Sequence, residues 1–157
     1  MGAGHHDKAA EVFKASLKIN PNHAETQSNL GSAYQAQGEL SKAEEFYREA
    51  LRLNPQINIS DNLGSVLISQ GRYKESIEVY RSGLIKQPKN ARVFSNLLLT
   101  LNYMEDISQQ DIFDEHNKWS QVFEEPLNYM VHEASNHNKE SLRIGYYSPD
   151  FREHSVA

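Results

Sequence analysis

The sequence predicts an all-α protein in which helical hairpins stack into a superhelix, followed by a capping helix and a short orphan β-strand tail. Two observations predict this fold. Small and apolar residues recur at intervals of about 34 residues, which is the length of one helix–turn–helix unit. Within each interval the apolar residues lie three or four apart, so each helix has one face to bury against its neighbours.

Residues 24–56 form the most complete unit. Seven small, apolar or turn-forming residues define its pattern: Leu30, Gly31, Tyr34, Gly38, Ala43, Tyr47 and Pro55. Gly31 and Ala43 are small where the two helices of the hairpin approach closely, and Gly38 turns the chain between them. Pro55 follows the second helix, at a position where helices commonly stop.

This pattern resembles the tetratricopeptide repeat, with Gln27 where that repeat usually has a tryptophan. The resemblance implies a module for protein–protein interaction. It also implies that the first helices of successive repeats line a concave surface.

The chain opens within a repeat rather than before one. Ala9, Phe13 and Pro21 precede Ala43, Tyr47 and Pro55 by one repeat length each. Residues 1–23 are therefore predicted to be a half repeat that holds only a second helix. Gly4 likewise precedes Gly38 by one repeat length, so Gly4, His5 and His6 are predicted to form a turn.

Residues 57–90 form a second complete repeat, which follows the first at an interval that is one residue shorter. The residues that match the first repeat are Leu63, Gly64, Gly71, Tyr80 and Pro88. The missing residue belongs between Pro55 and Leu63. We expect the deletion to lie in the turn, where changes of length are tolerated and the stacking is preserved.

Residues 91–104 repeat the first-helix pattern once more, which completes a repeat region at 1–104; the matching residues are Phe94, Leu97, Leu98 and Leu101. A capping helix is then predicted within 105–126. Its apolar stripe predicts a helix from about 109 to 124 that closes the end of the stack, with a partly buried His116 beside Trp119; the stripe is Ile112, His116, Trp119 and Phe123.

Two pairs of residues have the spacing of helix N-terminal caps. Ser41 and Glu44 form an S-x-x-E capping box, which predicts that Ser41 caps the second helix of the first full repeat. Ser108 and Asp111 predict a similar cap for the helix at 109–124.

Composition limits the partners and the chemistry. Sixteen Lys and Arg residues against twenty-one Asp and Glu residues give a net charge of -5, so neither nucleic acid nor a membrane is a predicted partner. The sequence contains no cysteine, which fits a cytoplasmic protein. We predict no metal site, because His132, Glu133 and His137 miss the H-E-x-x-H zinc spacing by one residue. We also predict no cofactor.

The C-terminal part changes character. Residues 127–141 are polar and predict a linker, and Leu142, Ile144 and Tyr146 alternate with other residues as in a short strand. Residues 142–157, L-R-I-G-Y-Y-S-P-D-F-R-E-H-S-V-A, resemble the start of the catalytic region of the O-linked N-acetylglucosamine transferases and their Spindly-like relatives, glycosyltransferase family 41, in the bacterial branch. The resemblance implies a truncated catalytic region in which His154 matches a histidine near the acceptor and the sugar.

Three asparagines are candidates for peptide binding. Asn29, Asn62 and Asn96 each precede the leucine of a first helix, so they recur once in each repeat. In the transferases that the chain resembles, an asparagine ladder at this position holds the backbone of extended peptides on the concave face. An amide side chain offers a donor and an acceptor, as each peptide unit does. The alternative is that these are ordinary surface residues.

Two functional hypotheses follow. In the first, the chain is the substrate-presenting N-terminal part of a protein O-glycosyltransferase, which is inactive by itself because the lobe that binds the nucleotide-sugar donor is absent from this sequence. In the second, it is a stand-alone scaffold or adaptor with no link to glycosyl transfer. The strand at 142–147 is expected to be unpaired within the chain, which would allow self-association through it.

Overall fold

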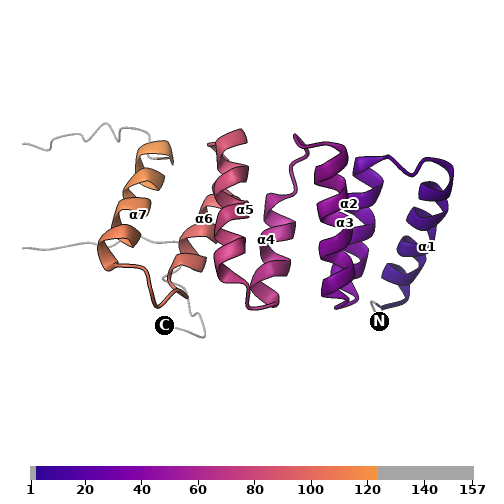
Figure 1. Cartoon of the computed structure of the whole chain (residues 1–157), viewed down its shortest axis with the longest axis horizontal. Coiled ribbons are helices and arrows are strands. Elements are labelled where there is room, and N and C mark those ends of the chain that lie inside the picture. Colours follow the sequence, from indigo (N-terminus) through magenta and orange to yellow (C-terminus); the bar gives the residue numbers. More distant parts are fainter. Residues whose placement is uncertain (1–2, 124–157) are drawn as a thin grey trace, which may run out of the picture. The chain divides into compact units, whose positions relative to one another are not determined.

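The computed structural model describes residues 3–123, which form seven α-helices (Figure 1). The helices are α1 Ala3–Ile19, α2 Ala24–Ala36, α3 Leu40–Leu53, α4 Ser60–Ser69, α5 Tyr73–Lys86, α6 Ala91–Leu101 and α7 Gln109–Phe123. The prediction of an all-α helical repeat is confirmed for this part of the chain. The predicted linker, the strand at 142–147 and His154 lie outside the described residues.

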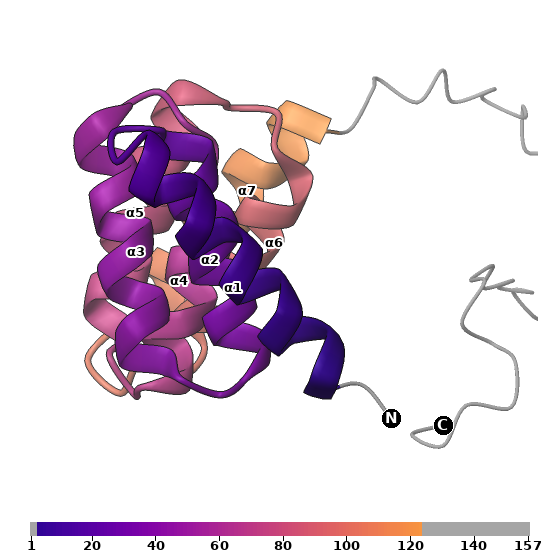
Figure 2. The same ribbon diagram turned by 90° about the vertical axis from the view of Figure 1, so that its right-hand side faces the viewer.

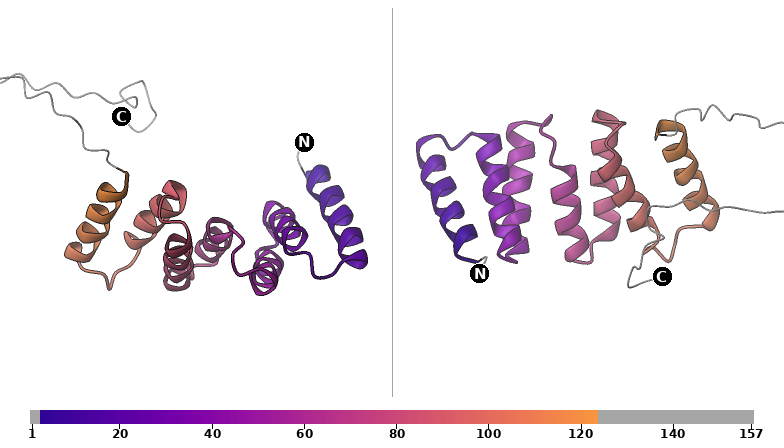
Figure 3. Two further views of the ribbon diagram at one scale, coloured as in Figure 1. Left: turned by 90° about the horizontal axis from the view of Figure 1, so that it is seen from above. Right: turned by 180° about the vertical axis from the view of Figure 1, so that it is seen from behind.

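The helices pack in the order in which the chain makes them. Helix α1 packs on α2, and the pairs α2–α3, α4–α5 and α6–α7 form successive hairpins. Contacts of α3 with α4 and of α5 with α6 join one hairpin to the next (Figures 1 and 3). Viewed along the stack, α3 and α5 lie on one side and the first helices α2, α4 and α6 on the other (Figure 2).

Two glycines reverse the chain between the helices of the complete repeats. Gly38 and Gly71 have φ angles of +79° and +75°, a left-handed conformation that glycine adopts without steric cost. The residue after each glycine donates a backbone hydrogen bond of 2.9 Å to the last turn of the preceding helix, Glu39 to Tyr34 and Arg72 to Leu67. The predicted turn at Gly38 is confirmed, and its equivalent in the next repeat is built identically.

The turn predicted at Gly4, His5 and His6 is wrong. These residues belong to α1, which begins at Ala3. Gly38 and Gly71 each follow a helix whose direction has to be reversed, whereas Gly4 lies in the first turn of α1. The segment therefore continues the helical path of α1.

The first predicted capping box is also wrong, and the second is confirmed. Helix α3 begins at Leu40, one residue before Ser41, and its N-cap Glu39 makes no side-chain capping bond. Glu44 is bound elsewhere, by two arginines. At α7, by contrast, the Asp111 N–H donates to Ser108 Oγ over 3.1 Å, and the Ser108 N–H donates to Asp111 Oδ2 over 3.3 Å.

The deleted residue falls between α3 and α4, as expected, but it also shortens a helix. Helix α4 has 10 residues where α2 has 13. The segment that would form its first turn is not helical, yet Ile57 and Ile59 pack against the apolar core around Tyr47 and Leu63. Side-chain packing by these two isoleucines, in place of a helical turn, therefore maintains the contact between the two complete repeats.

An aromatic ring lies over a glycine in each complete repeat. Tyr47 and Tyr80 are both 0% exposed. A Cβ atom added to Gly31 would lie 2.9 Å from the Tyr47 ring, and one added to Gly64 would lie 2.2 Å from the Tyr80 ring. The small residues predicted from the repeat pattern thus let the second helix seat its tyrosine against the first.

Helix α7 packs on α6 less completely than predicted. Ile112, Trp119 and Phe123 contact the core of the last hairpin, and Phe94 meets Phe123 edge to face at 6.1 Å. Trp119 is only half-buried, and α7 has no fully buried residue. Trp119 packs on the last hairpin as predicted but is not fully buried, because only α6 packs extensively against α7 among the described helices.

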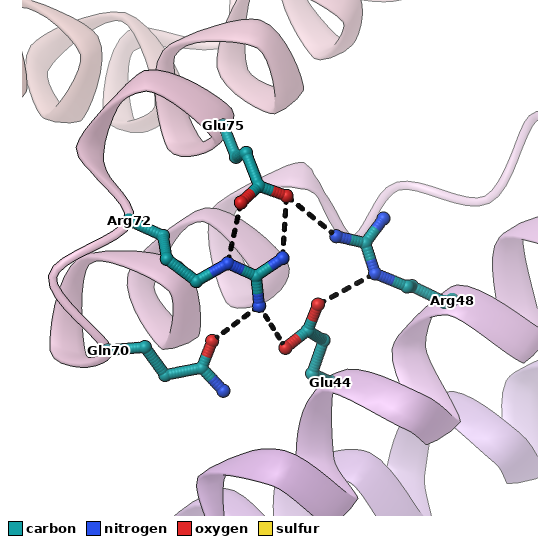
Figure 4. A network of polar contacts seen from close by, with 5 residues as sticks. All are labelled: Glu44, Arg48, Gln70, Arg72 and Glu75. Carbon is teal, nitrogen blue, oxygen red and sulfur yellow. Dashed lines mark hydrogen bonds and ion pairs between the residues drawn. The ribbon is translucent and has the colours of Figure 1, made fainter.

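A cluster of charged side chains joins the two complete repeats on the side of their second helices (Figure 4). Arg72 donates to Glu44 Oε2 of α3 and to both carboxylate oxygens of Glu75, each over 2.6 Å. Arg48 bonds Glu44 at 2.8 Å and Glu75 at 3.4 Å. The two carboxylates and the two guanidinium groups therefore alternate in a closed ring.

In the part of the chain that the structure describes, no helix is long and apolar enough to cross a membrane.

Candidate peptide-binding face

The three first helices each present one polar stripe that is exposed or half-buried. We call the surface made by these stripes the first-helix face. Its members are Glu25, Asn29, Ser32 and Gln35 of α2, Asp61, Asn62, Ser65 and Ser69 of α4, and Arg92, Ser95, Asn96 and Asn102 of α6. The stripes arise because the apolar positions of each helix are used by the core, which leaves the opposite side polar.

Hydrogen bonds join the stripes of α2 and α4 around the hydroxyl of Tyr47. Tyr47 Oη donates to Gln35 Oε1 over 2.8 Å and lies 2.9 Å from Ser32 Oγ. Asn62 Nδ2 donates to the same hydroxyl over 3.2 Å, and Gln35 Nε2 donates to Ser65 Oγ over 2.9 Å. The first two stripes are therefore one continuous polar surface, supported from beneath by a buried tyrosine.

A different contact joins the stripes of α4 and α6. Asp61 accepts a hydrogen bond of 2.6 Å from Asn96 Nδ2 and pairs with Arg92 Nε at 2.8 Å. Asp61 and Arg92 neutralise each other, so Glu25 is the one member of this face whose charge is not balanced by another member. A nearly neutral surface of amides and hydroxyls is suited to uncharged ligands.

The three predicted asparagines lie at equivalent positions on this face but differ in what they offer. Asn29 is exposed, and its side chain makes no hydrogen bond among the described residues. Asn62 and Asn96 are half-buried, and their Nδ2 atoms already donate to neighbouring repeats. Asn62 keeps its carbonyl oxygen for a ligand, and Asn96 keeps its carbonyl oxygen and one N–H. Peptide binding by the three stays a prediction.

The buried tyrosine network was not predicted from the sequence. The repeat pattern identifies Tyr47 as a core residue, whereas its hydroxyl also organises the polar face. Tyr80 is its equivalent, but Tyr80 Oη has no hydrogen-bond partner among the described residues. Gln35 accepts the hydrogen bond of the Tyr47 hydroxyl, but the equivalent residue in the next repeat is Ile68, which has no acceptor for the Tyr80 hydroxyl. A position-by-position comparison of the two repeats would have revealed this difference. Burial raises the pKa of Tyr80.

The described residues hold no group of three or more His, Asp or Glu side chains placed to bind a metal ion. His116, predicted to be partly buried beside Trp119, is exposed. Both residues line a groove between α6 and α7.

Comparison with known families identifies the repeats. Residues 24–57 and 60–92 match the Tetratricopeptide repeat family, and residues 3–38 match a TPR repeat family. The resemblance predicted for the repeats from their sequence pattern is confirmed.

Solved structures share the fold at low sequence identity. An O-GlcNAc transferase of Thermobaculum terrenum is 24% identical with a TM-score of 0.69, over 80% of this chain and 24% of that one. Two structures of MamA give TM-scores of 0.72 and 0.64 at 22% and 24% identity, and the matches cover 80% and 74% of this chain and 68% and 66% of those. The chain thus spans about a quarter of the length of that transferase and about two thirds of the MamA chains.

Proposed function

Since the chain is built from tetratricopeptide repeats, which generally mediate protein–protein interactions, we propose that its first-helix face binds an extended, uncharged segment of a partner protein. One observation carries this proposal. Asn29, Asn62 and Asn96 occupy the same position on three successive first helices, and hydrogen bonds between those helices join them into one surface.

The chemistry of the face fits a peptide backbone better than a charged ligand. A peptide unit offers one N–H and one C=O whatever its side chain, and the asparagine amides can match both. Each such hydrogen bond contributes about 0.5 to 1.5 kcal/mol, so several spaced along the face are needed for useful affinity. The repeat spacing supplies them in register.

The test is titration of an extended Ser/Thr-rich peptide against asparagine variants. Asn29→Ala is the cleanest variant, because it removes an exposed amide that has no internal hydrogen bond among the described residues. It should weaken binding severalfold, and the triple change of Asn29, Asn62 and Asn96 to Ala should weaken it severely. Asn117→Ala, an exposed asparagine of α7 outside this face, is the matched control.

Stability has to be followed in the same experiment. Asn62→Ala also removes the bonds to Ser32 and Tyr47, so its thermal midpoint should fall slightly, while that of Asn29→Ala should hold. Unchanged affinity in the triple variant would contradict the proposal.

We further propose that this face presents substrates for a protein O-glycosyltransferase of the O-GlcNAc transferase type, of which the chain is a catalytically incomplete N-terminal part working in the cytoplasm. Two features support this: the resemblance of residues 142–157, with His154, to the start of such a catalytic region, and the fold shared with the Thermobaculum terrenum enzyme. The purified chain should transfer no sugar from UDP-N-acetylglucosamine to a peptide. Sugar transfer by the purified chain would refute the proposal that it is catalytically incomplete.

A stand-alone scaffold is the second candidate. It is favoured by the likeness to MamA, because that match covers about two thirds of the MamA chains, whereas the transferase match covers a quarter. The coding sequence beyond Ala157 separates the two candidates, since only the transferase requires a nucleotide-sugar domain there. Self-association through the segment at 142–147 belongs to either candidate. It should appear in sedimentation velocity as a dimer that Ile144→Pro removes.

A further inference from the structure

The first-helix face changes from polar to apolar at its α6 end. Ser32 and Ser65 occupy one position on α2 and α4, where their hydroxyls take part in the bonds that join those helices. Leu99 occupies the same position on α6, one repeat after Ser65, and 53% of its surface is exposed. Exposing a leucine where the earlier repeats have serine brings apolar surface onto an otherwise hydrophilic face.

Leu99 belongs to a groove between α6 and α7. Leu98, Leu99 and Trp119 form its apolar part, while Ser95, Asn102 and His116 supply its polar groups. Asn102 Nδ2 is used internally, because it donates to the Leu98 carbonyl over 2.8 Å. The groove therefore combines apolar contact from Leu98, Leu99 and Trp119 with the polar groups of Ser95 and His116.

Two properties of the groove limit what it can hold. No Asp, Glu, Lys or Arg side chain lines it, whereas the groove that contains Phe94 and Leu97 is lined by Arg81, Glu115 and Lys118. The Trp119 indole N–H is buried and has no acceptor among the described residues. The ring is thus held by packing and not by a hydrogen bond.

We infer that this groove is a specificity pocket that takes one aliphatic or aromatic side chain of the segment bound along the first-helix face. The inference rests on the proposed function. It adds selectivity for the partner's side chains to a face that otherwise recognises only the partner's peptide backbone. Ser95 and Leu99 lie one turn apart with Asn96 between them, so a chain that bonds to Asn96 passes directly beside the groove. The partner segment is uncharged where it crosses α2 and α4 and apolar where it reaches α6.

Trp119 is the single tryptophan of the chain, so its fluorescence reports on the groove directly. The experiment uses the full chain and three peptides of about 12 residues, about 40 Å long when extended. All are built from Ser, Thr and Ala; one has Leu near its N-terminus, one has Leu near its C-terminus, and one has no Leu. One of the two Leu peptides should bind about tenfold more tightly than the third and should shift the Trp119 emission.

Two variants locate the effect. Leu99→Ser restores at α6 the residue found at this position in α2 and α4. It should abolish the preference, so that the Leu peptide binds this variant no more tightly than the peptide without Leu does. Ile85→Ser removes a still more exposed apolar residue, 82% exposed, from α5 outside the groove, and it should keep the preference. The thermal midpoints of both variants should match that of the unaltered chain.

The outcomes separate this inference from the proposed function. If no peptide binds, the proposed function fails; if all three bind equally, the function survives and the pocket is refuted. Trp119 emission that depends on protein concentration without peptide would mean that a second copy fills the groove. A Trp119 shielded from acrylamide both before and after binding would mean that the chain itself fills it. Either result would also overturn the pocket.

Discussion

At the scale of single residues, the two complete repeats use the same tyrosine differently. Tyr47 and Tyr80 both seat their rings against a glycine, but only Tyr47 has partners for its hydroxyl among the described residues, which are Ser32, Gln35 and Asn62. The Tyr80 ring also lies closer to Gly64 than the Tyr47 ring lies to Gly31. Substitutions at equivalent positions should therefore have unequal effects.

Removing the hydroxyl should destabilise one repeat and not the other. Tyr47→Phe deletes a bonded buried hydroxyl and leaves its neighbours unsatisfied, so it should lower the free energy of unfolding by about 1 to 2 kcal/mol. Tyr80→Phe deletes a hydroxyl that lacks a partner among the described residues, so it should be neutral or slightly stabilising. Urea denaturation of the two variants checks this. Equal losses would show that Tyr80 has a partner after all.

Adding a methyl group should separate the two glycines. An alanine within a helix is favoured over glycine by about 1 kcal/mol, which opposes the cost of crowding the tyrosine ring. At Gly31 the added Cβ lies 2.9 Å from the ring and the two effects nearly cancel. At Gly64 it lies 2.2 Å away, so Gly64→Ala should cost about 1 to 3 kcal/mol. A shift of the thermal midpoint confined to Gly64→Ala is the expected result.

At the scale of helices, the sequence correctly predicted the features that its periodic pattern determines. The spacing of leucine, glycine and tyrosine located the hairpins, and Ser108 with Asp111 located the start of α7, because these depend on residues close in sequence. The cap at Ser41 and Glu44 failed because α3 begins one residue earlier and Glu44 binds Arg48 and Arg72 instead. Arg72 is 28 residues away in sequence, so a local motif does not include that competitor. The tyrosine network was missed for the same reason, since Gln35 and Ser65 are 30 residues apart.

The charged ring that joins α3 to α5 should make stability depend on pH. Burial alone raises the pKa of Glu44, but hydrogen bonds from Arg48, Arg72 and Gln70 together outweigh it and leave its pKa below the usual 4.5. Hydrogen bonds from Arg72 lower the pKa of Glu75 as well. Carboxylates with a depressed pKa stabilise the fold above about pH 4.5, and this contribution is lost as the pH falls through their lowered values.

The test compares thermal midpoints at pH 7 and in steps below pH 4.5. The unaltered chain should lose stability in the acid range, and Arg72→Ala should lose less between the two conditions because it lacks the central cation. Arg81→Ala, which breaks the pair from α5 to Glu115 of α7 outside the ring, is the matched control. Parallel pH profiles for Arg72→Ala and the unaltered chain would exclude a role for the ring.

At the scale of the whole described region, α7 completes a third hairpin. The ion pair from Arg48 of α3 to Glu75 of α5 has a counterpart further along the stack, where Arg81 of α5 pairs with Glu115 of α7 at 3.2 Å. The predicted capping helix thus also takes the place of a second helix. Its shallow burial makes this end the weakest part of the stack that the structure describes.

Trp119→Ala should loosen that end selectively. Because the ring is only half-buried, the cost should be about 1 to 3 kcal/mol, less than for a fully buried tryptophan. In repeat proteins each unit contacts mainly its neighbours, so amide exchange should accelerate in α6 and α7 and change little in α2 and α3. Uniform acceleration across all helices would mean that the stack unfolds as one unit.

The order in which the helices pack also governs how quickly the chain can find its structure. Apart from α4 with α6, the extensive contacts among the described helices join helices that are adjacent in sequence. Low contact order of this kind goes with folding in microseconds to milliseconds, because each contact closes only a short loop. A nucleus can therefore form at any hairpin, and the best packed one, α2 with α3, is where we expect it. During synthesis on the ribosome, we therefore expect the hairpin of α2 and α3 to form before α6 and α7 have been synthesised.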